Sequence, residues 1–512
     1  MTIAAAPITP PSRVTSPSRR VVPLIAAIAV MMRLPGLGHA PWPDEAGFLV
    51  VGQQWHSGGS SLYGSYWVDR PPLLVTIFRF AAHVGGIVPL RLIGCVAVAG
   101  IVIGVGHVAQ QMAVERAAMW AAICAAALCA SPMLGTAEVN GELLSAPFVV
   151  AGIAASVRAI GEPRARRVWG FAMLAGAATI AALLTKQNMA DVGVFAAVAG
   201  LFALREGQIT RGRLAALVGG LVSGSLVVVV VMSGWTLAHG TSLSGVYYAV
   251  YPFRMAAGHV LATSTRSQAS SRLVSLLGGW VASGLAVISL LVVAAIVTRR
   301  LHGHVPWALV ATVAFASVSV LAGGNYWQHY LVELVVPVSI LAGVLVARVQ
   351  PGIRPTVTTA AVISAIGWGL TLPHAVASNQ GAMVGSAIRA VSSPTDTIVT
   401  AYGNAEVTQA SGLQSPYPYL WSLPAKTLDP DQRVMDAVLS GPSAPTWFVV
   451  WHQISTWGLQ TDRTTQILSS KYHAVARLQG HTVYLHDGVD RAPPTVPTHA
   501  LTTSAPSKEH LP

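Results

Sequence analysis

Long apolar stretches separated by short polar segments dominate the first three quarters of the chain. Eleven of them are about 17–25 residues long, which is the length that an α-helix needs to cross a membrane. These stretches lie near residues 21–38, 91–111, 116–133, 144–160, 168–185, 189–205, 213–236, 274–298, 304–323, 330–348 and 355–373. The pattern predicts a polytopic α-helical membrane protein with about 11 transmembrane helices, in a membrane domain that extends from residue 21 to residue 373.

Composition supports a membrane protein and argues against a nucleic-acid-binding one. The 512 residues are 53% hydrophobic and only 10% charged, whereas soluble proteins carry roughly 25% charged residues. The formal net charge is +12, but the arginines punctuate the apolar segments, a pattern that orients membrane helices. The three cysteines all lie inside apolar stretches, so no disulfide framework is predicted.

The arginine and lysine distribution predicts the orientation of the chain. If residues 1–20 form a disordered cytoplasmic tail, the inner side collects Arg13, Arg19, Arg20, Arg116, Arg158, Arg164, Arg166, Arg167, Arg205, Arg211, Arg213, Arg299, Arg300, Arg348 and Arg354. The outer loops keep fewer basic residues, namely Arg70, Arg79, Arg91, Lys186, Arg254, Arg266 and Arg272. This excess predicts a multi-pass cell-membrane protein with a cytoplasmic N-terminus and, for an odd number of spans, an extracytoplasmic C-terminal part.

Two further segments have patterns of their own. The apolar stretch Pro71–Pro89 is interrupted by Arg79 and His83, which predicts an interfacial helix within an outer loop 39–90. Residues 385–488 alternate short β-rich runs with two capped helical segments at 429–441 and 461–472, which predicts a small extracytoplasmic α/β domain. Residues 489–512 are rich in Pro and Thr and are predicted to be disordered.

Chemistry-bearing residues gather on the predicted outer side. Asp44 and Glu45 follow the first span, and the later outer loops carry Glu138, Glu142, Lys186, His329 and Tyr330, with Tyr247, Tyr248 and Tyr251 between them. The inner loops are short and basic. Any chemistry is therefore expected at the outer membrane surface.

Four motifs in this order resemble those of the C-type (GT-C) glycosyltransferases. They are "RLPGLGHAPWPDEAGF" (33–48), "YGSYWVDRPPLL" (63–74), "TKQN" (185–188) and "NYWQHYLVELVVP" (325–337). The nearest branch resembles protein O-mannosyltransferases and the lipid A aminoarabinose transferase. The first two motifs are the specific ones, and the match covers roughly residues 30–345.

The resemblance implies a GT-C fold and a membrane glycosyltransferase. Such an enzyme moves a sugar, mannose- or arabinose-like, from a polyprenyl-phosphate donor to a glycan, lipid or protein acceptor outside the cytoplasm, with inversion. It implies no nucleic-acid partner, and it assigns no cofactor, although a divalent cation is left open because relatives differ.

The reaction requires both signs of charge at separate points. A carboxylate near the acceptor hydroxyl accepts its proton, and Asp44 fits this base, with Glu45, Glu138 and Glu142 as the other acidic candidates. The departing phosphate needs cations or helix N-terminal amides. Arg70 directly precedes Pro71 and Pro72, which suit a helix start, and Lys186, His329 and Tyr330 are further candidates for the phosphate site. Relatives often have Lys where this chain has Arg70, which keeps the positive charge but offers a planar fork in place of a compact ammonium group.

Each candidate also has a purely structural interpretation. Asp44 and Glu45 could be solvated loop carboxylates, and Glu138 and Glu142 could cap a helix. Lys186 could extend toward the interface from a span end, while His329, Tyr330 and the three tyrosines could belong to an interfacial aromatic belt. The sequence does not distinguish Glu138 from Glu142 as the functional residue.

Other motifs carry less weight. "DPD" (429–431) resembles a metal-binding motif but stands at a predicted helix start, where Asp is a good cap, and "HGH" (302–304) lies in an inner turn. No Gly-rich phosphate loop is present, which favours a lipid-linked donor. The alternative functions are a membrane transporter or lipid flippase, and a scaffold whose outer domain binds partners.

Overall fold

The computed structural model describes residues 18–113, 115–263, 266–298, 301, 303–348, 352–371, 379–454 and 459–496. The tails expected at 1–20 and 489–512 lie outside these residues, apart from residues 18–20 and 489–496. His302 of the "HGH" motif also lies outside them.

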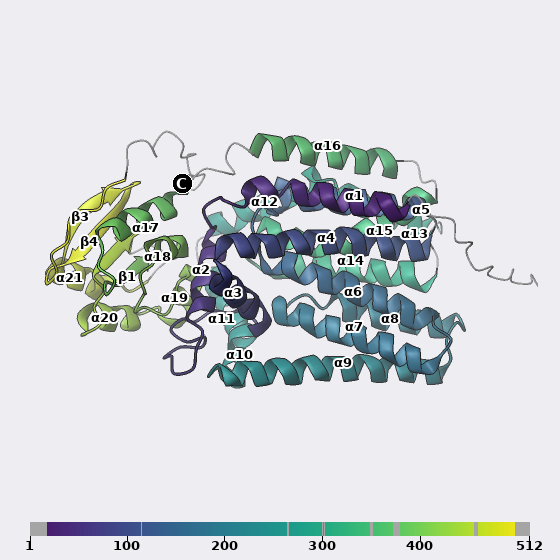
Figure 1. Ribbon diagram of the computed structural model, residues 1–512, viewed down its shortest axis with the longest axis horizontal. Coiled ribbons are helices and arrows are strands. Elements are labelled where there is room, and N and C mark those ends of the chain that lie inside the picture. The colour runs from purple at the N-terminus through teal and green to yellow at the C-terminus, as the bar shows by residue number, and fades with distance from the viewer. Residues whose placement is uncertain are drawn as a thin grey trace, which may run out of the picture.

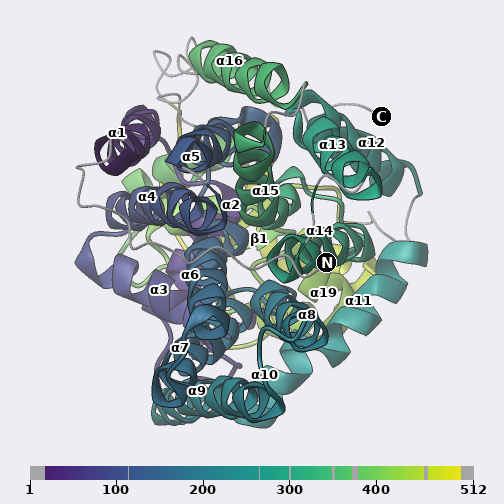
Figure 2. The same cartoon turned by 90° about the vertical axis from the view of Figure 1, so that its right-hand side faces the viewer.

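Most of the described chain forms a bundle of helices that run along the long axis of the molecule (Figure 1). Figure 2 looks along this bundle from the end opposite the C-terminal domain. The long helices are α1 (Ser18–Met31), α4 (Ile87–Met112), α5 (Glu115–Ala130), α6 (Gly141–Gly161), α7 (Ala165–Thr185), α8 (Asp191–Arg205), α9 (Arg211–Ala238), α13 (Leu285–Val297), α14 (His304–Ala322), α15 (Val335–Ala347) and α16 (Ile353–Thr371).

Length and composition identify six helical segments in the described part of the chain as candidate membrane spans. They are α4, α6, α7, α9, α14 and the segment Gln328–Ala347, which joins the 3₁₀ helix η3 (Gln328–Leu334) to α15. The expected class, a multi-pass helical membrane protein, is confirmed. The expected number of about 11 spans is not, because α1, α5 and α8 have only 14, 16 and 15 residues, short of the roughly 20 that a spanning helix needs.

The span expected at 274–298 is not one continuous helix. It is divided between α12 (Arg266–Ala282) and α13, whose axes meet at 63°. Gly284 has a φ of +79° between them, a left-handed conformation that glycine adopts easily. The hydropathy of this segment indicated a span, but it did not reveal the bend. This bent pair would be a seventh span if it crosses as a unit.

Small residues bring α7 and α9 into close contact. A Cβ atom built on Gly220 or Gly224 of α9 would lie 2.5 Å from the carbonyl oxygen of Trp169 or 1.8 Å from that of Met173. Gly176 of α7 meets Leu221 of α9 in the same way. Such a small-residue contact lets membrane helices approach backbone to backbone, so these glycines set the spacing of this helix pair.

Short helices gather at one end of the bundle, beside the C-terminal domain (Figure 1). They are α2 (Pro43–Gln53), α3 (Pro72–Val84), α10 (Leu243–Val250) and α11 (Pro252–Thr263). We call this the domain end of the bundle. Tyr247, Tyr248 and Tyr251 were expected in an outer loop, whereas the structure places the first two in α10 and Tyr251 directly after it.

The C-terminal residues form a four-stranded sheet with helices around it. The strands β1 (Ile398–Ala401), β2 (Trp447–Val450), β3 (Tyr472–Leu478) and β4 (His481–His486) have the order β1-β2-β4-β3, in which only the β1–β2 pair is parallel. The helices are α17 (Gln380–Val391), α18 (Ala405–Ser411), α19 (Ser422–Leu428), α20 (Arg433–Ser440) and α21 (Asp462–Lys471). The pattern did not predict β3, which follows α21 directly.

Among the described residues, three hydrogen bonds that involve main-chain groups attach this domain to the first loop, residues 39–90. The Asn379 amide donates to the Pro41 carbonyl at 2.7 Å, and the Ser415 N–H donates to the Tyr66 hydroxyl at 2.9 Å. In the opposite direction, the Trp67 N–H donates to the Pro418 carbonyl at 3.1 Å. The loop is thus held between the bundle and the sheet domain.

A buried ion pair holds the same loop on the bundle. Glu45 of α2 and Arg91 of α4 meet at 2.7 Å and are 0% and 4% exposed. Glu45 also accepts hydrogen bonds from the N–H groups of Trp42 at 3.1 Å and Val139 at 2.9 Å. One carboxylate therefore caps α2, binds α4 and holds the segment before α6.

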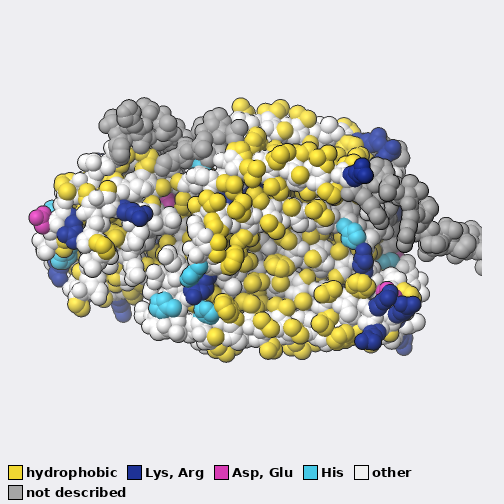
Figure 3. Space-filling view, in the orientation of Figure 1, with side chains coloured by type: hydrophobic (Ala, Val, Ile, Leu, Met, Phe, Trp, Pro, Cys, Tyr) yellow, Lys and Arg dark blue, Asp and Glu magenta, His cyan; other side chains and the backbone are white. Residues whose placement is uncertain are grey.

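The visible surface of the bundle has the charge distribution of a membrane protein. Apolar side chains cover its middle, and Lys and Arg side chains gather at the end opposite the domain end (Figure 3). Because basic residues favour the cytoplasmic side, the domain end is expected to face away from the cytoplasm.

This orientation can be tested with reporters. A reporter active only outside the cytoplasm should give a strong signal when fused to the C-terminus of the full chain. The same reporter inserted between α8 and α9, at residues 206–210, should be silent there. A cytoplasm-only reporter that is active at the C-terminus would contradict the orientation and the proposed extracytoplasmic site.

The buried ion pair predicts a large loss of stability when one partner is removed. Arg91→Met should destabilise the protein by about 3–5 kcal/mol, because it leaves the Glu45 charge buried and uncompensated. Thermal unfolding in detergent, followed by intrinsic fluorescence, should show a clearly lower midpoint. The double variant Glu45→Gln/Arg91→Met should recover part of the loss.

The matched control is Arg167→Met. Arg167 pairs with Glu162 at 3.9 Å and its side chain is 60% exposed, so its removal should cost less than about 1 kcal/mol. Equal midpoints for Arg91→Met and Arg167→Met would show that the Glu45–Arg91 pair does not hold the first loop.

Candidate active site

Asp44 lies in the first turn of α2, directly after Pro43. Proline is favoured at this position because its φ already suits a helix. The Oδ1 atom of Asp44 accepts a hydrogen bond from the indole Nε1 of Trp421 at 2.8 Å. Among the described residues its side chain has no other hydrogen bond or ion pair, so Oδ2 is left free. Asp44 is half-buried and is thus accessible from one side.

Arg70 lies just before α3, which begins at Pro72 as the proline pair predicted. Its Nη1 atom contacts Oδ1 of Asp69 at 2.7 Å, and its guanidinium lies 5.4 Å from the centre of the Phe48 ring. The Tyr63 hydroxyl donates to the Arg70 carbonyl at 2.7 Å, which fixes the backbone at this point. Phe48 of α2 therefore joins Arg70 to the helix that carries Asp44.

A second arginine reaches the same carboxylate. The Nε atom of Arg254 in α11 lies 2.9 Å from Oδ2 of Asp69, which is buried. Burial alone would raise the pKa of Asp69, but Arg254 and Arg70 outweigh it and hold that pKa below its usual value. Asp69 therefore stays ionised between two guanidinium groups, and the three residues carry a net charge of one positive unit.

Asp69 and Arg254 are not among the site residues that the sequence predicted. Asp69 adjoins Arg70 in the motif "VDRPPL", which is the signal that could have suggested it. Arg254 was expected only as one of the basic residues on the outer side, since nothing in the sequence indicates that α11 reaches the first loop.

Lys186 and Glu142 form a further buried ion pair, with 2.8 Å between Nζ and Oε1. Glu142 lies in the first turn of α6, which Asn140 caps by accepting from the N–H of Leu143 at 2.9 Å. Lys186 follows the last residue of α7, and its Nζ atom lies 5.1 Å from the centre of the Tyr330 ring. Burial lowers the pKa of Lys186, and the Glu142 carboxylate opposes that shift only in part.

The remaining predicted residues complete the cluster. The Nδ1 atom of His329 lies 3.1 Å from Oε1 of Glu138, and the His329 and Tyr330 rings meet edge to face at 5.1 Å. Burial raises the pKa of Glu138, an effect that the His329 hydrogen bond partly offsets. Glu138 and Glu142 thus each have a separate basic partner.

These pairs form one electrostatic unit at the domain end. The negative charges of Asp44 and Glu142 act to raise the pKa of Arg70. The positive charges of Arg70 and Arg254 act to lower the pKa of Lys186. All eight residues selected from the sequence therefore lie near this end of the bundle. They differ in availability, because Glu45 is fully engaged with Arg91, Trp42 and Val139 while Asp44 keeps a free oxygen.

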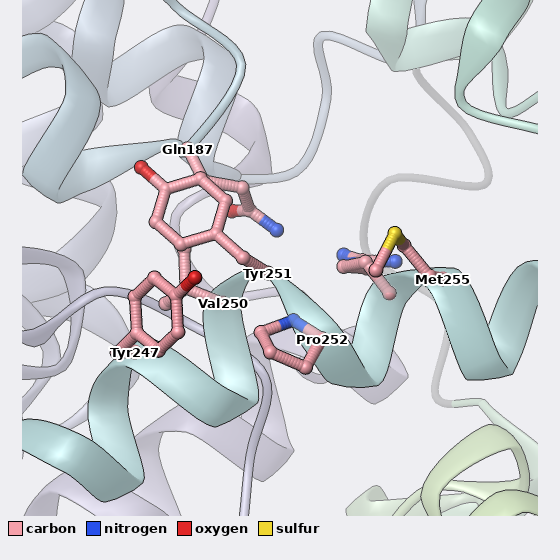
Figure 4. Close-up of a pocket in the computed structure, with 7 residues that line it drawn as sticks. Gln187, Tyr247, Val250, Tyr251, Pro252 and Met255 are labelled. Carbon is pink, nitrogen blue, oxygen red and sulfur yellow. The ribbon is translucent and has the colours of Figure 1, made fainter.

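A pocket of about 380 Å³ opens beside Arg254. Its walls come from Gln187 and from α10 and α11, as Tyr247, Val250, Tyr251, Pro252 and Met255. Figure 4 shows the Tyr247 and Tyr251 rings on one side of this space and Met255 on the other. The pocket thus combines mainly apolar walls with one cationic group.

Within the described ranges, no group of three or more His, Cys, Asp and Glu side chains is placed to hold a metal ion. The "DPD" segment fits the helix-cap interpretation, since the Asp429 carboxylate accepts from the N–H groups of Val434 at 3.0 Å and Met435 at 3.1 Å at the start of α20.

Comparisons with known proteins give a structural match only. No family model and no curated protein matches the sequence. Two crystal structures of ArnT from Cupriavidus metallidurans, one bound to undecaprenyl phosphate and one in the apo state, are each 15% identical to this chain. Each match covers 92% of this chain and 98% of ArnT, with TM-scores of 0.57 and 0.58.

The apo oligosaccharyltransferase of Archaeoglobus fulgidus is also similar. It is 13% identical, the match covers 85% of this chain and 69% of that one, and the TM-score is 0.50. At such identities the likeness concerns the fold. The chain therefore has the GT-C glycosyltransferase fold in its ArnT-like form, as the resemblance of its motifs predicted.

Proposed function

We propose that this protein is a membrane glycosyltransferase that moves a sugar from a polyprenyl-phosphate donor to an acceptor outside the cytoplasm. One observation carries the proposal. A half-buried carboxylate with a free oxygen, Asp44, lies at the same end of a GT-C bundle as the net-positive group Asp69–Arg70–Arg254. Transfer from a lipid phosphate needs both, one for the acceptor proton and one for the leaving phosphate.

The donor side is assigned to the two arginines and the pocket beside them. Asp69 neutralises only one of the two guanidiniums, so the group attracts an anion while each arginine stays oriented. The pocket beside Arg254 has walls that suit hydrocarbon. A ligand with a phosphate head and an apolar chain fits this combination, and ArnT of the same fold was solved with undecaprenyl phosphate bound.

The acceptor side is assigned to Asp44. In the proposed reaction the acceptor hydroxyl oxygen attacks the anomeric carbon and forms the new glycosidic bond. The bond from that carbon to the phosphate oxygen breaks, and its electron pair leaves with the phosphate. The hydroxyl proton passes to Oδ2 of Asp44. Attack opposite the leaving group inverts the anomeric centre.

The other candidates take supporting roles in this proposal. Glu45 holds α2 in place through Arg91, because both of its oxygens are engaged. Lys186 pairs with Glu142 and lies beside the Tyr330 ring. It is the further N–H donor that we assign to the phosphate, near Arg70. His329 and Glu138 form a pair that can shift a proton as the phosphate charge changes. The sugar is proposed to be mannose- or arabinose-like.

The function and its base can be tested together. Detergent-purified protein is mixed with polyprenyl-phosphate-mannose or polyprenyl-phosphate-arabinose that carries a ³²P-labelled phosphate, together with a cell-envelope extract that supplies glycan, lipid and protein acceptors, and released polyprenyl phosphate is measured. Asp44→Asn should lower turnover by at least ~10²-fold, because Asn keeps the shape and the Trp421 contact but accepts no proton. Donor affinity should be largely unchanged.

Two controls make this result specific. Asp487→Asn removes a half-exposed carboxylate that pairs with His473 and should leave transfer unchanged. Glu45→Gln should reduce transfer less than Asp44→Asn does. Normal turnover in Asp44→Asn would show that Asp44 is not the base, and no release from either donor by the unmodified protein would contradict the proposed donors.

The phosphate side gives a separate prediction. Arg70→Ala and Arg254→Ala should each weaken binding of polyprenyl phosphate together with turnover, because the attraction acts in ground state and transition state alike. Arg70→Lys should restore part of the loss, since it returns the charge without the planar fork. Titration of the purified variants with polyprenyl phosphate measures this.

The control is Arg167→Ala at the opposite end of α7, a helix of 21 residues and hence about 30 Å long. It should bind like the unmodified protein. If Arg70→Ala keeps its affinity for polyprenyl phosphate, Arg70 does not belong to the phosphate site, and Arg254, Lys186 and His329 are the remaining candidates.

A further inference from the structure

The C-terminal domain contributes a side chain to the candidate active site. Trp421 precedes α19, yet its indole Nε1 donates a hydrogen bond of 2.8 Å to Oδ1 of Asp44, 377 residues away in the sequence. Its ring centre lies 5.0 Å from that of Phe48. Phe48 also carries the Arg70 guanidinium on its ring, so the indole contacts Asp44 directly and is linked to Arg70 only through Phe48.

The helix that carries Asp44 is shaped to receive this ring. A Cβ atom built on Gly47 would lie 2.3 Å from Cζ2 of Trp421, closer than real side-chain contacts allow. Gly47 lies one turn after Asp44 on α2, where alanine would otherwise be the better helix former. The missing side chain is therefore the space that the indole occupies.

The indole hydrogen bond is additional to the attachment of the domain. Three other hydrogen bonds already join the domain to the first loop, through Asn379, Ser415 and Trp67, and α18 packs against α2. Loss of the indole N–H alone would leave these contacts in place. Its effect would therefore fall on Asp44 more than on the assembly of the domain.

We infer that Trp421 is a positioning residue for Asp44, an inference that rests on the proposed function. The indole N–H occupies Oδ1, fixes the orientation of the carboxylate and leaves Oδ2 as the oxygen that accepts the acceptor proton. Because Trp421 touches Asp44 and no part of the phosphate site, except through Phe48, it acts on proton transfer rather than on donor binding. The active site is thus incomplete without the C-terminal domain.

Two variants of the full-length protein test this inference independently. Trp421→Phe keeps an aromatic ring and removes the N–H, and it should lower turnover by about tenfold or more, the effect of one hydrogen bond to a charged group. Gly47→Ala leaves Trp421 unmutated but displaces its ring through the added methyl group, and it should cause a similar loss of turnover. Affinity for polyprenyl phosphate should stay within about twofold in both.

The matched control is Trp447→Phe. Trp447 is buried in the same domain, and its indole N–H has no hydrogen-bond partner among the described residues. This variant makes the same chemical change without touching Asp44, so turnover should stay near that of the unmodified protein. Unchanged or increased turnover in Trp421→Phe would overturn the inference, since an increase would mean that the indole competes with the acceptor.

A double-mutant comparison separates positioning from general damage. If Trp421 acts through Asp44, Trp421→Phe should cause little further loss in an Asp44→Asn background. A full additional loss in that background would show that Trp421 acts elsewhere.

A spectroscopic signal distinguishes failure of this inference from failure of the proposed function. In protein labelled with 5-fluorotryptophan, the ¹⁹F signal that disappears in Trp421→Phe should shift in Asp44→Ala, which removes the hydrogen-bond acceptor, and the Trp447 signal should not. This holds whether or not sugar is transferred. A shift without transfer would contradict the proposed function but keep the contact, whereas an unmoved signal would overturn the contact and the positioning role.

Discussion

The buried contact between the Glu45 carboxylate and the Arg91 guanidinium is the constraint on which the domain end of the bundle depends. A charge without a partner in so enclosed a place would cost several kcal/mol, so α2 has to lie where Arg91 can reach it. The same carboxylate binds the N–H groups of Trp42 and Val139, and it thereby fixes the start of α2 and the segment that leads to Glu142. Asp44 precedes Glu45 in the chain, so its position follows from that of its neighbour. The two adjacent carboxylates therefore differ in role. Glu45 is fully engaged in structural contacts, whereas Asp44 keeps one oxygen available.

The basic side chains at this end of the bundle are neutralised to different degrees. Glu45 has one arginine and Glu142 has one lysine, and each pair is neutral. Asp69, by contrast, lies between two arginines, and this is where positive charge is left over. An excess charge at a site that water reaches poorly is a strong attraction for an anion, because the surrounding dielectric screens it little. The position of the leftover charge beside an apolar pocket is what distinguishes the proposed lipid-phosphate site from the neutral ion pairs around it.

Hydropathy and local motifs predicted the class of fold and most of the charged residues that gather at the domain end. Apolar runs report burial in a membrane directly, so the bundle and the positions of its helices could be read from the sequence, and the adjacent pairs Asp44–Glu45 and Arg70–Pro71 stood out through their neighbours. The bend at Gly284 could not be read in this way, because hydropathy averages over a segment and does not register one backbone angle. Strand β3 was missed because it continues from a helix without a turn residue. Asp69, Arg254 and Trp421 were missed because their roles arise from contacts between distant segments, and a single sequence has no pattern for those.

The sheet domain and the bundle meet at the first loop for a reason that follows from the proposed chemistry. A polyprenyl donor is confined to the membrane, so its phosphate can be bound only by residues at the end of the bundle, as Arg70 and Arg254 are. An acceptor outside the cytoplasm approaches from water, on the side of the first loop that the sheet domain covers. Asp44 lies where the two meet. The Glu45–Arg91 pair fixes the position of α2, and Trp421 fixes the Asp44 side chain. The first loop and the C-terminal domain share one apolar core cluster, in which Ala405 and Leu420 pack with residues of α2 and α3, and Trp421 reaches Asp44 across this contact. The membrane part alone can orient the backbone of α2, but the orientation of the Asp44 side chain requires the domain that faces the acceptor.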